Sequence, residues 1–432
     1  MSLLIVLISV ALAPAILYFF WGRRSATRPY PPGPPPRLFT GNLYDVPKTK
    51  AWETYFQWSK TYGSGLVHYE ANSRHTVIIN TKELSDRMLE QRSRIYSDRP
   101  YIPMVDLLGW GPINTGNIHA ASVILTVVYG YDISTTNDYF VDIAEKAVGT
   151  LSLLVTPAAA IVNIFPVLRR LPLWFPIFEF QRSAAVSRKL VDQMFEVPYQ
   201  YVRSNMRAST AKPSLLSKLL ERNDANGGDQ DQEFVIKSVC ATGYSAGADT
   251  SVSVTSTFFL AMAMHPEVQK KAQEELDTMI GRGRTPGYEE RPNLPYIEAI
   301  FKETLRWAPA LPAGLSRAAF SDDVVDGYYI PKGATIISNF WAIARDESVY
   351  PNPDSFIPER FLNEDGTCVD DNSTFAFGAG RRVCPGRHLA SASLWMVISS
   401  VLAEFDIGKP TTLNGKEIRS LADAEYSDGL IR

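Results

Sequence analysis

The sequence predicts a mainly α-helical protein with small β-sheets, and three observations support this fold class. Hydrophobic residues make up 45% and aromatic residues 11% of the 432 residues, so the chain can bury a large core and is not disordered. From Gly41 onward, apolar residues recur mostly at helical spacing. The β-rich pieces are short, as at Thr76 to Asn80 and Tyr328 to Ser338.

The first element is an apolar segment, Leu3 to Trp21, that contains no charged residue. About 20 apolar residues in a helix cross the hydrocarbon core of a bilayer, so residues 1–21 are predicted to be a single membrane anchor. A cleaved signal peptide is the alternative. It would need a basic region before the apolar segment, which is missing here, and Pro14 would follow the small residues at the cleavage site.

The next element, residues 22–40, is a basic and proline-rich connector. Arg23, Arg24 and Arg28 follow the apolar segment directly, and positive charge marks the cytosolic side of a membrane span. The run from Pro29 to Pro36 cannot form helix or sheet hydrogen-bond ladders. We therefore expect a stiff spacer that holds a cytosolic domain of residues 41–432 near the membrane.

The longest predicted helix runs from about Gln232 to Met264, after a polar loop at Asn223 to Gln232. Its middle contains Gly247 and other residues that lower intrinsic helix stability. His265-Pro266 ends it, and Glu267 to Ile280 is predicted to be an amphipathic helix.

Charge and cysteine content exclude two classes of protein. The formal net charge is −3, which offers no electrostatic reason for binding nucleic acid, so no nucleic-acid partner is expected. The three cysteines, Cys240, Cys368 and Cys384, are an odd number spread along a long chain, which argues against a disulfide framework. A functional cysteine would therefore be a ligand or a nucleophile.

Cys384 lies in a glycine-rich loop that precedes a predicted helix, Arg387 to Leu402. Backbone N–H groups, the helix end and the charges of Arg381 and Arg382 are all expected to lower the pKa of its thiol. The glycines would let a large flat group approach the backbone. A purely structural cysteine is an alternative. Zinc bound by Cys384 and His388 is disfavoured, because no second ligand pair has suitable spacing.

Two further pairs are candidate functional residues. Glu303 and Arg306 share a helix face and can form an ion pair, although an exposed pair contributes only about 0 to 1 kcal/mol. Asp249 and Thr250 lie in the middle of the long helix, where they form either a polar face or a ligand-facing pair.

Together these stretches resemble the cytochrome P-450 family of haem-thiolate monooxygenases, in its microsomal, fungal-type branch. The haem-binding signature FxxGxRxCxG is matched by Phe377, Gly380, Arg382, Cys384 and Gly386. Three other family motifs occur in the expected order: AGxDT at Ala246 to Thr250, ExxR at Glu303 to Arg306, and PERF at Pro358 to Phe361.

The resemblance implies the cytochrome P-450 fold behind one transmembrane helix and a role for each matched residue. Cys384 would be the axial ligand of the iron of haem b, in a cofactor loop that includes Phe377, Gly380 and Gly386. Arg382 and Arg317 would bind the haem propionates. Asp249 and Thr250 would deliver protons during catalysis. A structural network would join Glu303, Arg306 and Arg360.

The resemblance also implies partners and a location. An NADPH-dependent cytochrome P-450 reductase would supply electrons, and the substrate would be a lipophilic small molecule. The protein would be a single-pass protein of the endoplasmic reticulum membrane, with its catalytic domain facing the cytosol.

The sequence departs from the family at two places. The stretch Pro112 to Ala121 is too short to hold the helices and the WxxxR haem contact that members carry there, and the chain stops at Arg432 before the usual closing strand. One alternative is therefore a truncated, non-catalytic product that cannot bind haem. Another is a haem-thiolate isomerase or dehydratase, against which the intact Asp249-Thr250 pair argues.

Overall fold

The computed structural model describes residues 28–109, 121–133, 138–150, 162–163, 167–168, 179–369 and 374–409. The predicted anchor at residues 1–21 and most of the shortened stretch at 112–121 lie outside the described residues. Within the described ranges, no helix combines the length and apolar character needed to cross a bilayer.

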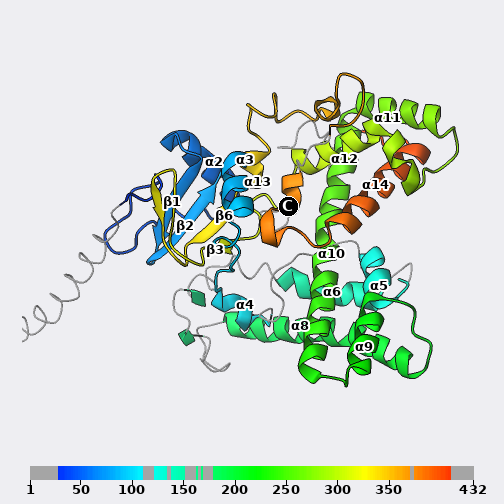
Figure 1. Ribbon diagram of the computed structural model, residues 1–432, viewed down its shortest axis with the longest axis horizontal. Helices are drawn as coiled ribbons and strands as arrows, with labels where there is room; N and C mark the ends of the chain where they lie inside the picture. Colours follow the sequence, from blue (N-terminus) through cyan, green and yellow to red (C-terminus); the bar gives the residue numbers. More distant parts are fainter. Residues whose placement is uncertain are drawn as a thin grey trace, which may run out of the picture.

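The described residues form a mainly helical architecture with two small sheets, in agreement with the predicted fold class (Figure 1). The α-helices are α2 (Ala51–Tyr62), α3 (Lys82–Ser85), α4 (Pro103–Leu107), α5 (Ala121–Tyr129), α6 (Tyr139–Gly149), α8 (Glu179–Arg207), α9 (Leu215–Ala225), α10 (Gln230–Met264), α11 (Pro266–Met279), α12 (Pro295–Trp307), α13 (Phe340–Ile343) and α14 (Arg387–Glu404). A π-helical segment, η1, covers Asp86–Gln91. The short 3₁₀ segments are η4 (Tyr288–Asn293), η5 (Pro358–Phe361), η6 (Thr374–Phe377) and η7 (Gly380–Arg382).

The larger sheet has four strands in the order β1-β2-β6-β3. Strands β1 (Leu66–Ala71) and β2 (Arg74–Ile79) form an antiparallel hairpin, and β6 (Thr335–Ser338) runs parallel to β2. The two-residue strand β3 (Arg317–Ala318) pairs with the other edge of β6. The pairing of β2 with β6 joins residues far apart in sequence, so the sheet places the Arg317 strand one strand away from the amino-terminal hairpin.

The β-rich piece Tyr328 to Ser338 is not one strand. Its first part is β5 (Tyr328–Ile330), which pairs with β4 (Asp323–Val325) in a separate two-stranded sheet, whereas its last part is β6. The break contains Pro331, which cannot donate a ladder hydrogen bond, and Gly333 at φ 78°. The turn between them directs the chain from one sheet to the other.

The predicted long helix is confirmed as α10, which begins at Gln230 and ends at Met264. Asp229 caps it by accepting hydrogen bonds from the amides of Asp231 and Gln232, so the helix starts earlier than the sequence suggested. The preceding loop is correspondingly shorter, since α9 continues to Ala225. The predicted amphipathic helix is confirmed as α11, with Pro266 in its first turn.

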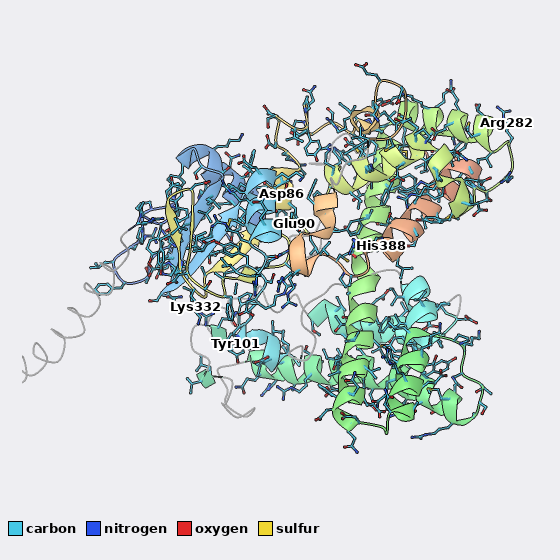
Figure 2. All side chains as sticks on the ribbon, viewed as in Figure 1. Asp86, Glu90, Tyr101, Arg282, Lys332 and His388 are labelled. Carbon is cyan, nitrogen blue, oxygen red and sulfur yellow. The ribbon has the colours of Figure 1, made fainter. Side chains whose placement is uncertain are left out.

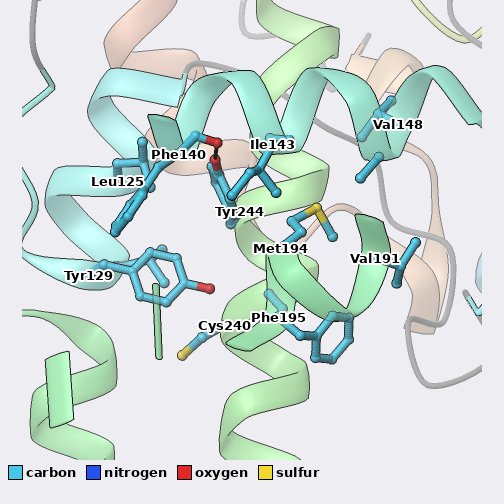
Figure 3. Close-up of a cluster of buried hydrophobic side chains, with 14 of the residues drawn as sticks. Leu125, Tyr129, Phe140, Ile143, Val148, Val191, Met194, Phe195, Cys240 and Tyr244 are labelled. Atoms are coloured by element: carbon cyan, nitrogen blue, oxygen red, sulfur yellow. Dashed lines mark hydrogen bonds between the residues drawn. The ribbon is translucent and has the colours of Figure 1, made fainter. Parts of the chain in front are cut away.

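Helix α10 is shared by two hydrophobic cores. Its first half packs with α5, α6 and α8, where Tyr244 donates a hydrogen bond to the carbonyl oxygen of Phe140 (Figure 3). Its second half packs with α11, α12 and α14. On α10 the buried members of the first core end at Tyr244 and those of the second begin at Val254. The stretch between them contains Ala246 to Thr250.

The described part of the connector is packed on the domain. Its prolines lack N–H groups but keep their carbonyl oxygens, and those of Pro29 and Pro32 accept hydrogen bonds from the amides of Tyr329 and His68. Between these prolines, the Tyr30 ring stacks on the rings of His68 and His75, at 4.8 Å between centroids in each case. The hydrogen bonds of Pro29 and Pro32 therefore link this part of the connector to both sheets.

Candidate functional site

Cys384 lies in a closed loop between η7 and α14. Its amide donates a hydrogen bond to the carbonyl oxygen of Phe377 at 2.8 Å, and the amide of Val383 donates to Gly380 at 3.0 Å. A Cβ added at Gly386 would lie 3.8 Å from Cys384 Sγ, which is an ordinary van der Waals contact. Figure 1 shows this orange segment between the larger sheet and α10.

The predicted lowering of the thiol pKa was wrong for the protein alone. Burial raises the pKa of the Cys384 thiol, and this effect outweighs the lowering by the Gly386 amide and by Arg387. The nearby cation is therefore Arg387 and not Arg381 or Arg382. Arg382 instead donates from Nε to the carbonyl oxygen of Ser97 at 2.8 Å.

Arg317 connects the larger sheet to the cysteine loop. It is 5% exposed, and its Nη2 donates to the carbonyl oxygen of Ala379 at 2.7 Å. Its Nη1 is buried and has no hydrogen-bond partner among the described residues. Burial, followed by the charges of Arg99 and Arg382, lowers the pKa of Arg317 to about 10, with Glu90 acting in the opposite direction. The positively charged Arg317 side chain therefore has a buried N–H group that forms no hydrogen bond with an anion among the described residues.

These residues fit haem. A haem needs an axial ligand for its iron and donors for its two carboxylates, and Cys384 with the unpaired Nη1 of Arg317 offers both kinds of group. Cys384 is only partly exposed and belongs to no disulfide, so its thiol is free to bind a metal. Arg382 keeps its terminal nitrogen atoms for further contacts, since the described structure records only its Nε bond.

Position 380 requires glycine because of a close contact within the chain, and not because of a bound flat group. Gly380 has φ 60°, and a Cβ there would lie 1.8 Å from the carbonyl oxygen of Leu89 in η1. Its amide donates to Glu90 Oε1 at 2.6 Å, and Figure 2 shows Glu90 beside the orange loop segment. The close approach at this glycine is thus to another part of the chain.

Glu303, Arg306 and Arg360 lie in one buried network. Glu303 is 0% exposed and accepts two hydrogen bonds from Arg306, at 2.7 and 2.8 Å, and one from Arg360 Nε at 3.2 Å. A fourth comes from the amide of Ile357 at 2.8 Å. The remaining donors of both arginines bind main-chain carbonyl oxygens between residues 344 and 355. The network thus ties α12 to η5 and to the segment that leads to the cysteine loop.

Asp249 and Thr250 lie on the part of α10 that belongs to neither core. The Asp249 side chain is outside the described residues, and Thr250 is half-buried. Helix α10 contacts α14, the helix that follows Cys384. The structure therefore brings the helix of this pair next to the helix that follows the cysteine loop.

A cavity outlined by described residues lies elsewhere. It has a volume of about 640 Å³, and η4 and the start of α12 line it together with Cys368. None of the motif residues belongs to its lining.

Two residues near the site were not predicted from the sequence. Glu90 binds the Gly380 amide, and Arg99 binds the carbonyl oxygens of Leu315 and Ser316 beside Arg317. Neither belongs to any of the four family motifs. Their only local signal is a charge-rich stretch, which usually forms a solvated surface.

Comparisons with known proteins agree with this arrangement. The family model described as cytochrome P-450 matches residues 117–420. Cytochrome P-450 monooxygenase 208 of Postia placenta is 36% identical, over 98% of this chain and 92% of that protein. Cytochrome P-450 monooxygenase ple1 of Rhodocybe pseudopiperita is 34% identical, over 97% and 90% respectively. Cytochrome P-450 monooxygenase ppsD of Aspergillus oryzae is 33% identical, over 99% and 92%.

The alignment with the Postia placenta protein spans 478 positions, which is more than the 432 residues of this chain. That relative therefore has residues without a counterpart here. The match nevertheless covers nearly the whole chain, and the signature residues around Cys384 form a single closed loop. The chain belongs to the cytochrome P-450 family of haem-dependent monooxygenases, which are oxygen-incorporating oxidoreductases.

Proposed function

We propose that this chain binds haem b through Cys384 and inserts one oxygen atom of O₂ into a lipophilic small molecule. Electrons would come from NADPH through a cytochrome P-450 reductase. The observation that carries the proposal is the pairing of a free, partly exposed thiol with a buried arginine that has an unpaired donor, both held by the cysteine loop.

Each residue of the site has a definite task in this proposal. When bound, a haem with a thiolate ligand supplies the activation of dioxygen. Cys384 provides the thiolate, and Arg317 and Arg382 bind the two carboxylates through charge-assisted hydrogen bonds. The Thr250 hydroxyl holds a proton at Oγ1, and Asp249, the residue before it on α10, exchanges protons during catalysis.

Glu303, Arg306 and Arg360 take no part in the chemistry. These three side chains form hydrogen bonds and ion pairs with one another, and none of those bonds involves the cysteine loop. They stabilise the chain segment that precedes the cysteine loop. Their role is structural.

The proposal includes attachment to the endoplasmic reticulum membrane. Residues 1–21 would form the single anchor, and the arginines of residues 22–40 would keep the catalytic domain on the cytosolic side. Protease treatment of intact microsomes tests this orientation, since the domain should be digested without detergent. A domain that is protected until detergent is added would contradict it.

The reduced-plus-carbon-monoxide difference spectrum tests the ligand. The wild-type chain and Cys384→Ala are compared, with Cys368→Ala as a matched control, because Cys368 is also free and partly exposed but lies outside the loop. The thiolate-type Soret band should appear in the wild type and the control and be lost in Cys384→Ala. An unchanged band in Cys384→Ala would exclude Cys384 as the ligand.

The difference spectrum, together with an assay of O₂ consumption, distinguishes the alternative functions. Absence of haem from a folded wild-type chain would favour a non-catalytic product. A normal band without NADPH-dependent consumption of O₂, with reductase and a panel of lipophilic compounds present, would favour an isomerase or dehydratase.

A further inference from the structure

The peptide group between Ala379 and Gly380 is held by two side chains of opposite charge. Its carbonyl oxygen accepts a hydrogen bond from Arg317 Nη2 at 2.7 Å, and its N–H donates to Glu90 Oε1 at 2.6 Å. The negative end of the peptide dipole therefore meets a cation and the positive end meets an anion, so both bonds are charge-assisted. We call this peptide group and its two side chains the peptide clamp.

The peptide clamp fixes a torsion that glycine alone leaves open. Gly380 has φ 60°, but a glycine adopts positive and negative φ about equally well. Rotation of the clamped peptide group would change this φ and turn the carbonyl oxygen of Gly380, which accepts the amide of Val383 at 3.0 Å. Val383 directly precedes Cys384. The orientation that the clamp imposes is therefore passed to Cys384 through one hydrogen bond.

Glu90 contributes to the geometry of the loop more than to the stability of the fold. Its side chain is exposed, so water competes for its hydrogen bond and the net gain in folding free energy is small. Its charge also acts on Arg317, where it opposes the lowering of the pKa by burial and by neighbouring arginines. Glu90 thus supports the cationic donor on the other side of the same peptide group.

We propose that Glu90 is a positioning residue for the thiolate of Cys384, because it fixes the Ala379–Gly380 peptide group against Arg317. The inference rests on the proposed function, since it assumes that Cys384 binds the haem iron. The rival explanation is that the bond from Gly380 to Glu90 only adds general stability to the contact between η1 and η7.

Spectra of the reduced, carbon-monoxide-bound protein distinguish these explanations. When the Cys384 thiolate takes a proton from solvent, the Soret band moves away from the thiolate-type position, so the band reports the state of the ligand without any measurement of activity. Glu90→Ala removes the acceptor, whereas Glu90→Gln keeps an acceptor oxygen but removes the charge. Glu290→Ala is the matched control, because Glu290 also accepts a glycine amide, that of Gly287 at 2.7 Å, but in η4.

The expected result is selective loss of the thiolate-type band at constant total haem. In mild urea, Glu90→Ala should lose this band about 3- to 10-fold faster than wild type, as the loss of one hydrogen bond at an exposed group predicts. Glu90→Gln should lie between the wild type and Glu90→Ala, and Glu290→Ala should match the wild type. If Glu90→Ala does not fold, a faster loss in Glu90→Gln than in Glu290→Ala would support the inference.

Three other outcomes overturn the inference in distinguishable ways. Equal rates in wild type and Glu90→Ala would show that Glu90 does not position the ligand, while the proposed function stands. Equal acceleration in Glu90→Ala and Glu290→Ala would show a general loss of stability and would also refute the inference. A wild-type chain without a thiolate-type band would refute the inference and the proposed function together.

Discussion

The backbone of Gly380 lies so close to Leu89 that a Cβ on the glycine would be 1.8 Å from the Leu89 carbonyl oxygen. The two residues are almost 300 positions apart and belong to η1 and η7, which pack directly on each other. The Gly380 amide also donates to Glu90. A segment near the amino terminus therefore sets the shape of the cysteine loop.

Gly380→Ala should destabilise the protein by more than about 3 kcal/mol, because it combines strain at positive φ with a backbone clash that no side-chain movement can relieve. Gly366→Ala is the control. Gly366 also has positive φ, 80°, but a Cβ there would meet nothing within 4 Å, so only about 1–2 kcal/mol should be lost. Urea unfolding of both variants measures the difference. Equal losses would show that the contact with Leu89 has no energetic weight.

Glu303→Gln should lower the free energy of unfolding by about 3 to 5 kcal/mol, because it leaves the buried Arg306 without its counter-charge. Asp142→Asn provides the contrast, since its pair with Lys146 is exposed and should contribute less than about 1 kcal/mol. Thermal and urea unfolding of both variants, compared with wild type, would measure the difference. A Glu303→Gln protein as stable as Asp142→Asn would contradict the structural role.

The stacked pair His68 and His75 predicts a loss of stability in acid. Burial, and then the charge of His75, lowers the pKa of His68 from 6.5 to about 3. Between these two values the unfolded chain binds a proton at this position that the folded chain does not. The free energy of unfolding is therefore not reduced by His68 above pH 6.5. As the pH falls from 6.5 toward 3, protonation of His68 in the unfolded chain lowers the free energy of unfolding by at most about 1.4 kcal/mol per pH unit.

Replacing His68 by Phe keeps a ring beside Tyr30 but removes this titration, so unfolding free energies at pH 7 and pH 5 should differ less than in wild type. The exposed His388, at the start of α14, offers a control in His388→Phe (Figure 2). An unchanged pH dependence in His68→Phe would show that the pair does not control acid stability.

Thr250→Ala should uncouple electron uptake from product formation, because it removes a hydroxyl that holds a proton on the half-buried middle of α10. The ratio of hydrogen peroxide formed to NADPH consumed should rise severalfold. Thr242→Ala is the control, since that hydroxyl lies on the same helix and donates to the Ser238 carbonyl oxygen. A ratio that rises equally in both variants would point to a general effect on the helix.

The local sequence was sufficient to locate a helix end where a particular residue, such as proline, stops the helix. The His265-Pro266 step marked the end of α10, because the missing proline N–H acts within one helical turn, whereas the observed start at Gln230, capped by Asp229, lies two residues before the predicted one. The cysteine loop was recognisable for a related reason. Its motif residues all lie within ten positions, from Phe377 to Gly386.

Long-range packing decided the properties that depend on distant neighbours. Tyr328 to Ser338 divides between two sheets because its halves pair with different strands, β4 and β2. The thiol pKa of Cys384 is raised because burial outweighs the local amide and charge, and burial is not visible in the loop's own residues. Arg99 reaches Ser316, and Glu90 reaches the cysteine loop, only after chain segments more than 200 residues apart have folded together.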